Sequence, residues 1–491
     1  MPDPHHRKAA APRLCRPLVA AGLVLGLCGC ASVAQQPATL PAIAVPAAWT
    51  VAEAAAPAGS SSLAQWWTRF DDPLLASLVT QALQTNTSVA NAQAALRQAR
   101  ALRDVSAAGL YPAVGGSASA QRSRSGGNPA GNSVRAALDA DWELDVFGAN
   151  QSALDASEAA VLASAATLGD VQVAVTAEVA LAYITLRSAQ SLLTIASDNL
   201  ALQQETLQLT QWRMQAGLVT SLETEQARGA VEQTRAQLPV LQTSIRQSGH
   251  ALSVLTGQPP TALSSVLAEP RPVPQPAGDL ALAIPAETLR QRADVRAAEQ
   301  QVAAALARVA QADAARLPNF RLSGSIGLAA LTLGALTNGT SVLSALAASV
   351  TMPVFDAGAG LAQVRAQQAA LDQAGLAYQA TVLAALKEVE DALVALRGDR
   401  ERVARLQQAA EAATNAALLA RHRYAGGMVD FQTVVDTQRS QLTAQESVAA
   451  ASANLSADHV RLYKALGGGW RPEGSDAIGA ASAESIGNSH Q

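Results

Sequence analysis

The chain has 491 residues, of which 49% are hydrophobic, 3% aromatic and 15% charged. The apolar share is mostly alanine with leucine and valine, which favours long, closely packed helices over a bulky globular core. The formal net charge of −4 argues against the basic surface that a nucleic-acid partner would require.

Residues 1–29 are typical of a signal peptide. Basic residues precede an apolar stretch over 18–27 that is too short to span a membrane as a mature helix, and small residues follow it. Cys30 ends the stretch LCGC (27–30), which looks like a bacterial lipoprotein signal whose cysteine becomes the lipid-carrying first residue. The alternative is an ordinary secretory signal with an incidental cysteine. A covalent lipid on Cys30 is expected, with no metal or other cofactor, and Ala31 after it favours outer-membrane delivery.

A proline-rich segment divides the mature chain into two similar halves, because its seven prolines interrupt any helix there. Residues 83–119 align with 289–325 at an offset of 206, and further matches follow in the same order at an offset of 210. The sequence is therefore interpreted as an internal duplication. The expected segments are a flexible tether (30–62), a first repeat (63–257), a linker (258–285), a second repeat (286–470) and a disordered tail (471–491).

Each repeat is expected to form a helix, a strand hairpin and a long helical hairpin. Apolar residues between 175 and 200 step alternately by four and three positions, which is the spacing of a coiled-coil seam. No proline interrupts residues 150–216, so a helix of about 100 Å is expected there, and residues 358–425 repeat the pattern. The hairpins would turn at Gly217 and Gly427, and such long helices predict an elongated molecule.

The strands are predicted from alternation. Residues 134–146 place apolar side chains on one face and acids on the other, over a length that can cross a membrane as a tilted strand. Residues 320–328 alternate likewise, and residues 111–121 are a weaker strand. The expected strand hairpins cover about 111–146 and 319–355. A transmembrane helix over 328–355 is the rival interpretation, although glycines and a proline interrupt it.

Four strands per chain cannot close a barrel, and open strand edges in lipid leave backbone groups unpaired. The sheet must therefore close with strands of other copies. Two copies would give eight strands and a filled interior, whereas three would give twelve strands and a lumen. The acidic face would favour a wet lumen, hence three or more copies. The acids on that face are Asp139, Asp141, Glu143 and Asp145.

An enzymatic function finds little support. The histidines of the mature chain lack metal-ligand spacing, and the sequence contains neither a phosphate loop nor a GxSxG motif. The paired acids Asp71 and Asp72 come directly before Pro73, where helix capping is a simpler interpretation than catalysis. Neither a catalytic residue nor a metal site is predicted.

Several stretches carry a family resemblance, in one order over residues 63–468. They are WWTRFDDPLLASLVTQALQTN (66–86), YPAV (111–114), WELDVFGA (142–149), LRQRADVRAAE (289–299), MPVFDAGAG (352–360), EVEDAL (388–393) and RYAGGMVDFQTVVDTQRS (423–440). Together they resemble the TolC-type outer-membrane efflux family, the outer-membrane factor lipoproteins of drug-efflux systems. The resemblance covers nearly the whole mature chain.

The resemblance implies an α+β membrane protein that assembles as a homotrimer. Its twelve-stranded β-barrel would lie in the outer membrane of a Gram-negative bacterium, continuous with a long α-helical tunnel in the periplasm. Such a protein is a passive exit duct for small molecules. Its partners would be a periplasmic adaptor protein and an inner-membrane transporter, which would be proton-driven and would choose the cargo.

In the family the two helical turns form the periplasmic tip, which closes like an iris and meets the adaptor. Gly217 and Gly427 match these turns. Asp436 matches an acid that helps form a ring at the narrowest point of the tunnel, and Tyr424 matches a tyrosine that helps hold the closed state. Three such carboxylates around one axis would repel each other and favour cations. The alternative for Asp436 is an ordinary solvated carboxylate on a helix.

The chain departs from the family pattern close to this acid. Some relatives have a second acid where this chain has Thr433, a large apolar residue where it has Gln432, and an arginine where it has Val429. Phe431 could supply bulk nearby. The resemblance therefore implies a gate that depends mainly on one acidic ring, formed by Asp436.

Two other functions are alternatives to that of a small-molecule duct. A duct of the same shape could serve protein or peptide secretion, and the sequence separates these two poorly. A periplasmic adaptor lipoprotein also carries a lipid and a helical hairpin. Adaptors, however, have one hairpin within lipoyl-like strand modules, whereas this chain has two hairpins and a duplicated pair of amphipathic strands.

Overall fold

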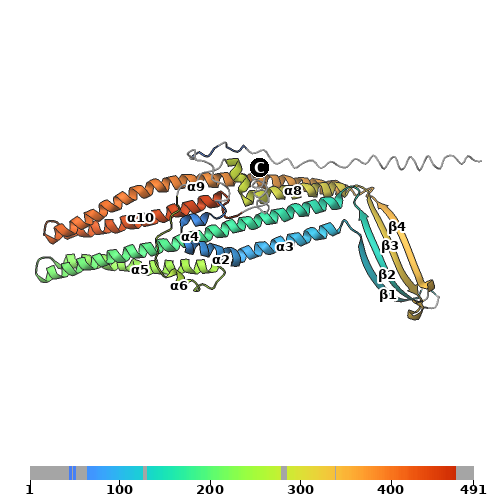
Figure 1. Cartoon of the computed structure of the whole chain (residues 1–491), viewed down its shortest axis with the longest axis horizontal. Helices are drawn as coiled ribbons and strands as arrows, with labels where there is room; N and C mark the ends of the chain where they lie inside the picture. Colours follow the sequence, from blue (N-terminus) through green and yellow to red (C-terminus); the bar gives the residue numbers. More distant parts are fainter. Residues whose placement is uncertain are drawn as a thin grey trace, which may run out of the picture. The chain divides into compact units, whose positions relative to one another are not determined.

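The computed structural model describes residues 44–46, 48–50, 63–124, 126, 130–277, 285–337 and 339–470. The predicted signal peptide, Cys30 with its lipid, most of the tether and the tail over 471–491 lie outside the described residues. The chain divides into two compact units (Figure 1). The sheet unit comprises the described residues within Ala107–Ala153 and Ala307–Gln367, and the helical unit holds the other described residues.

The sheet unit contains a four-stranded antiparallel sheet in the order β1-β2-β3-β4 (Figure 1). Its strands are β1 (Ala113–Ser123), β2 (Gly131–Leu144), β3 (Asn319–Ala330) and β4 (Val342–Thr351). Between β3 and β4 lie two short 3₁₀ turns, η3 (Leu333–Ala335) and η4 (Gly339–Ser341). The rival transmembrane helix over 328–355 is therefore wrong. Within the described chain, β1 and β4 each keep one unpaired edge, so the sheet is open.

The two faces of this sheet differ in polarity. Directly paired residues share a face, and the register pairs even with even and odd with odd throughout, as in Leu138 with Ile326 and Asp139 with Ser325. The even-numbered face exposes large apolar side chains. Those more than half exposed are Val114, Leu138, Ile326, Val342, Leu346 and Val350. The odd-numbered face carries serine, asparagine, arginine and the acids. The alternation predicted for residues 134–146 and 320–328 is thus observed in β2 and β3, whereas β4 departs from it because Leu343 lies on the odd-numbered face.

Long helical hairpins dominate the helical unit (Figure 1). The first consists of α4 (Ala149–Gln215) and α5 (Ser221–Leu255), and the second of α9 (Ala359–Ala425) and α10 (Phe431–Ala465). The helices predicted over 150–216 and 358–425 agree with α4 and α9 to within one residue at each end. Pro239 lies inside α5 without ending it.

Five shorter α-helices complete the described part of the chain. They are α2 (Pro73–Thr85), α3 (Thr87–Ala108), α6 (Ser264–Leu267), α7 (Pro285–Gln291) and α8 (Ala293–Ala314). α4 and α9 have 67 residues each, α5 and α10 have 35, and α3 and α8 have 22. Three equal lengths in the same order support the internal duplication inferred from the sequence.

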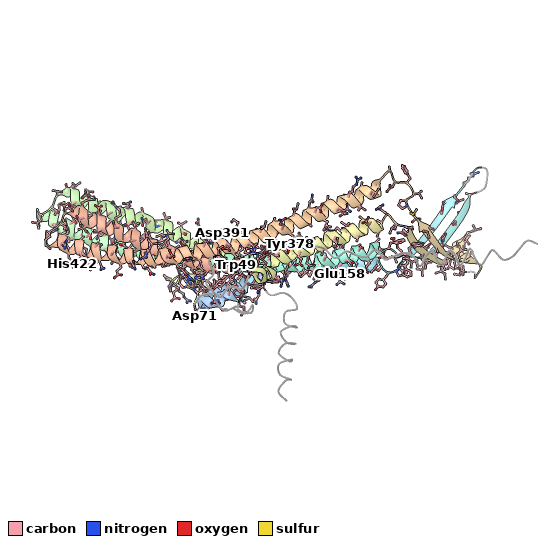
Figure 2. All side chains as sticks on the ribbon, turned by 90° about the horizontal axis from the view of Figure 1, so that it is seen from above. Trp49, Asp71, Glu158, Tyr378, Asp391 and His422 are labelled. Atoms are coloured by element: carbon pink, nitrogen blue, oxygen red, sulfur yellow. The ribbon has the colours of Figure 1, made fainter. Side chains whose placement is uncertain are left out.

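Aromatic side chains from the N-terminal part of the chain pack against α10. Trp66 begins the 3₁₀ helix η2 (Trp66–Phe70) and stacks on Tyr463, with the ring centroids 5.1 Å apart. Trp49, labelled in Figure 2, is 5% exposed and packs among apolar residues of α9 and α10. The amide of Thr50 donates to Glu390 Oε1 at 3.1 Å. The tether was expected to be flexible over 30–62, but this part of it docks because a tryptophan gains by burial.

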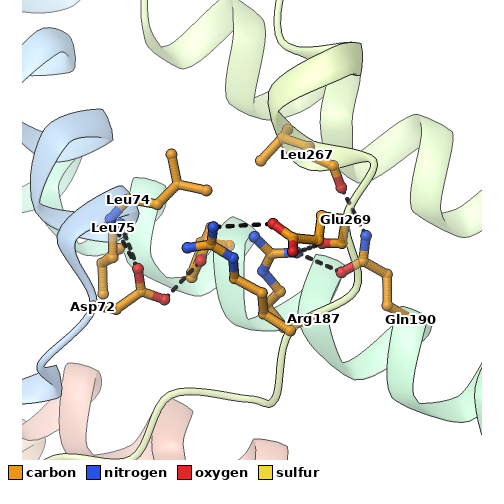
Figure 3. A network of polar contacts seen from close by, with 9 residues as sticks. Asp72, Leu74, Leu75, Arg187, Gln190, Leu267 and Glu269 are labelled. Carbon is orange, nitrogen blue, oxygen red and sulfur yellow. Dashed lines mark hydrogen bonds and ion pairs between the residues drawn. The ribbon is translucent and has the colours of Figure 1, made fainter.

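A polar network anchors the mid-chain linker to α4 (Figure 3). Arg187, which is fully buried, donates through Nη1 to Gln190 Oε1 at 2.6 Å and to the carbonyl oxygen of Glu269 at 2.7 Å. At the other end, Asp72 caps α2 as the sequence suggested, and it accepts a hydrogen bond from the Tyr183 hydroxyl at 2.6 Å. The guanidinium carbon of Arg187 lies 4.8 Å from the centre of the Tyr183 ring. α2, α4 and the linker are thereby held together.

Candidate functional site

The two long hairpins reverse direction through the same backbone turn. Gly217 and Gly427 have φ angles of 72° and 70°, in the left-handed region that favours glycine. In each turn the amide after the glycine donates to the carbonyl oxygen five residues earlier, at 2.8 Å in the first and 2.9 Å in the second. This bond is typical of a glycine-capped helix end. The structure thus places both glycines in the turns that the sequence predicted.

A three-residue contact joins the two hairpins next to these turns, and we call it the latch: Arg213, Glu223 and Tyr424. Arg213 donates to the carbonyl oxygens of Tyr424 at 2.9 Å and Ala425 at 3.3 Å. Its guanidinium carbon also lies 4.5 Å from the centre of the Tyr424 ring. The Tyr424 hydroxyl donates to Glu223 Oε2 at 3.1 Å. Burial, aided by the bond to Glu223, raises the pKa of Tyr424.

An apolar cluster lies beneath the latch. Phe431, at the start of α10, is 3% exposed, and its ring centroid lies 5.5 Å from that of Tyr424. Ala227, Val434 and Val435 complete the buried part of the cluster. Phe431 was expected to add bulk beside the constriction, but its ring instead supports Tyr424 from within the hairpin pair. Burial against another aromatic ring explains this difference.

Asp436 lies on the exposed side of α10. It accepts a hydrogen bond from Gln432 Nε2 at 3.0 Å, and Arg439 Nη1 lies 3.8 Å away. Gln432 in turn accepts a long hydrogen bond, 3.4 Å, from Gln226 of the first hairpin. Thr433 takes part in capping its own helix, because its amide donates to Oδ1 of the N-cap residue Asp430 at 2.8 Å. Of the predicted gate residues, the structure leaves Asp436 and Gln432 facing outward and turns Tyr424 and Phe431 inward.

The acids of the sheet lie on its odd-numbered face. Asp139, Asp141 and Glu143 share this face of β2, but arginines accompany them. Arg321 of β3 is the register partner of Glu143, and Arg135 lies four residues before Asp139 on the same face. The face is therefore of mixed charge, with three acids and two arginines among its described strand residues. The sequence pattern of β2 alone did not show the contribution of β3.

Asp145 has a different role from the one expected. β2 ends at Leu144, so Asp145 is not part of the strand. Its carboxylate accepts from the amides of Asn150 at 3.1 Å and Gln151 at 2.7 Å, in the first turn of α4. A carboxylate at a helix N-terminus satisfies free amides and suits the helix dipole. Asp145 therefore caps α4 and does not extend the row of acids.

Sequence reasoning missed two of the three latch residues. Arg213 occupies the position equivalent to Arg423 in the duplication, at the offset of 210, and Glu223 carries no sequence signal. The duplication did mark the position, since equivalent turns of two repeats must lie at equivalent ends of their hairpins. The duplication does not show which residue of the other hairpin each side chain contacts.

Comparisons with known proteins give the chain its relatives. The model of the outer membrane efflux protein family matches residues 78–258 and 284–468. The chain is 33% identical over 468 residues to the pyoverdine export outer membrane protein OpmQ of Pseudomonas putida, covering 92% of this chain and 97% of the relative. It is 31% identical over 412 residues to the toluene efflux pump outer membrane protein TtgF of Pseudomonas putida, covering 82% and 85%. Nodulation protein T of Rhizobium leguminosarum bv. viciae is 30% identical over 433 residues, covering 87% and 90%.

Solved structures share the fold. The outer-membrane channel OprN superposes with a TM-score of 0.81 at 35% identity, covering 89% of this chain and all of that one. The open state of the MtrE outer membrane channel of Neisseria gonorrhoeae gives a TM-score of 0.77 at 26% identity, covering 88% and 98%. The likeness therefore extends through both units of the chain.

Proposed function

Because the chain belongs to the outer membrane efflux protein family, we propose that it is the outer-membrane exit duct of a tripartite efflux system. It conducts small molecules passively from an inner-membrane transporter and a periplasmic adaptor to the cell exterior. One observation carries this function: an open four-stranded sheet with an apolar and a polar face occurs in the same chain as two long helical hairpins.

The open sheet requires further copies of the chain. Unpaired strand edges are unfavourable in lipid, so β1 of one copy pairs with β4 of the next. The apolar face turns to lipid and the polar face lines the lumen. Three copies give the twelve strands that leave a water-filled lumen, and they bring three latches and three Asp436 carboxylates around one axis. The lipid on Cys30 would hold each copy at the outer membrane.

The latch sets the resting state of the duct. Each latch ties the second hairpin to the first at the hairpin ends, so the duct is closed until the adaptor and transporter engage. Tyr424 contributes its ring and hydroxyl, and Arg213 contributes hydrogen bonds to the end of α9. Asp436 takes no part in the latch, and its exposed carboxylate, with Gln432 and Arg439 beside it, faces the axis and attracts cations.

Small molecules are favoured over proteins as the cargo. The relatives named above include a toluene efflux and a pyoverdine export protein, and both of these cargoes are small. An adaptor function is disfavoured, because the chain carries two long hairpins and a membrane-type sheet. Nodulation protein T is also similar, but its name states no cargo.

The test is a dye-efflux assay in the organism that carries this chain, with other ducts of the family deleted. Deletion of this gene should make cells preloaded with an efflux-pump dye such as ethidium retain the dye. Reintroducing the wild-type gene should restore dye efflux. The protein should fractionate with the outer membrane as a heat-modifiable assembly. Unchanged dye efflux, together with a secreted protein that disappears from the medium, would instead support the secretion duct.

A further inference from the structure

The apolar face of the sheet carries one charged residue among its described strand positions. In β1 that face consists of Val114, Gly116, Ala118, Ala120 and Arg122. The even-numbered residues of β2, β3 and β4 that share the face are uncharged. Arg122, paired in register with Asn132, is thus a single cation on a surface that otherwise suits hydrocarbon.

Arg122 lies at one extreme of this face. It is the next-to-last residue of β1, at the end where β1 connects to β2. Eight residues separate it from Val114, which is about 27 Å along a strand and roughly 20 Å across a membrane for a strand tilted by about 40°. An arginine facing lipid is costly at the midplane, but that cost nearly vanishes at the interface. Arg122 therefore marks the headgroup level.

The opposite end of the sheet carries aromatic residues. Trp142 and Phe320 lie on the apolar face near the ends of β2 and β3, and Phe147 follows with its ring centroid 6.3 Å from that of Phe320. Outer-membrane barrels carry girdles of aromatic residues at both membrane interfaces. The sheet thus has an aromatic boundary on the side where α4 begins and a basic boundary on the other.

Arg124 strengthens the basic boundary. It follows Arg122 by two residues, just beyond the end of β1, and both side chains are exposed. The acids of β2 that lie on the sheet are all on the opposite, polar face. Neither arginine forms an ion pair within the part of the chain that the structure describes. Two unpaired guanidinium groups at a membrane surface are suited to bind phosphate.

We propose that Arg122 and Arg124 form a binding site for the phosphate groups of an anionic lipid in the outer leaflet of the membrane. The inference rests on the proposed function in one respect, namely that the even-numbered face meets lipid. Three copies would place three such pairs around the barrel. Each pair would fix the depth of the barrel by holding charged headgroups at the end of its apolar band.

The test is native mass spectrometry of the purified assembly with lipid A as the probe. Arg122→Gln and Arg124→Gln are compared, singly and together, with Arg135→Gln, a matched control on the same strand hairpin but on the polar face. Each substitution at 122 or 124 should weaken lipid A binding by about fivefold, since this is the usual effect of one arginine near an anionic surface. The control should bind as the wild type does.

Lipid A lacking one phosphate tests the chemistry of the contact. The wild type should bind it more weakly than the bis-phosphorylated form, and the double variant should not distinguish the two lipids. Equal binding by all proteins, or an equal loss in Arg135→Gln, would overturn the proposal. An assembled, efflux-competent protein without phosphate-dependent binding would overturn only this proposal, whereas a failure to enter the outer membrane would overturn the proposed function.

Discussion

Asp436 is 54% exposed on α10, where it accepts a hydrogen bond from Gln432 and lies 3.8 Å from Arg439 Nη1. Asp436→Asn keeps the size of the side chain and removes its charge. If three of these carboxylates surround the axis, the variant should lose cation preference, because a ring of like charges attracts counter-ions. The reversal potential across a salt gradient, measured in planar bilayers, should shift toward that of a non-selective pore.

The control for this prediction is Asp391→Asn. Asp391 is an exposed acid of α9 that pairs with Lys387 at 2.6 Å, well before the turn at Gly427 (Figure 2). Its neutralisation should leave ion selectivity unchanged. A wild-type reversal potential in Asp436→Asn would mean that Asp436 is an ordinary surface carboxylate.

The bond between Tyr424 and Glu223 can be measured separately from the ring contacts. Tyr424→Phe removes the hydroxyl but keeps the ring beside Arg213 and Phe431. The loss should cost about 0.5–1.5 kcal/mol, and up to about 3 because the acceptor is charged. A double-mutant cycle with Glu223→Ala, followed by thermal unfolding of the helical signal, should show coupling between the two positions. Strictly additive effects would contradict the bond.

At the scale of elements, the second turn depends on one glycine. Gly427 has a φ of 70°, so Gly427→Ala should destabilise the hairpin by about 1–2 kcal/mol. Gly426→Ala is the control, because its φ is not positive and the nearest atom to an added Cβ is the flexible end of Met428, at 3.2 Å. Thermal unfolding should separate the two variants, and equal melting temperatures would contradict the role of the left-handed turn.

Tyr183 gives the contact between α2 and α4 a pH dependence. Burial, with the hydrogen bond to Asp72, raises the pKa of Tyr183 to about 12. Because folding raises this pKa, the protonated Tyr183 hydroxyl stabilises the folded protein fully below about pH 10, the ordinary tyrosine value. This stabilisation is lost as the pH rises through about 12. The absorbance titration of the wild type minus that of Tyr183→Phe should show one phenol ionising near 12. Ionisation near 10 would show that the hydroxyl is solvated.

The sequence predicted the elements more fully than their contacts. α4 and α9 could be placed to within a residue because apolar spacing and the absence of proline define a helix locally. Pro239 lies inside α5, where a local helix-breaking preference would end the helix. The docking of Trp49 and the roles of Glu223 and Asp145 depend on which surfaces meet, and periodicity shows the face that a residue occupies but not its neighbour. Strand alternation likewise predicts the polar face of β2, but it does not show that Arg321 of β3 lies beside Glu143 on that face.

At the scale of the molecule, the open sheet and the paired hairpins imply one assembly. In lipid, the edges of β1 and β4 require strands from additional copies, and a closed ring of copies repeats each hairpin end around one symmetry axis. The assembly that we propose is a water-filled pore, closed at the hairpin ends by the latch. Arg213 is the residue to change, because it combines two hydrogen bonds to the end of α9 with a contact to the Tyr424 ring.

Single-channel recording of the purified assembly in planar bilayers shows whether the latch closes the pore. The wild type should give small or brief currents, and Arg213→Ala should give larger, long-lived openings of uniform amplitude. Arg228→Ala, which removes an exposed arginine paired with Glu225 on α5, should behave as the wild type does. Identical currents in the wild type and Arg213→Ala, or no current from either assembled protein, would contradict the claim.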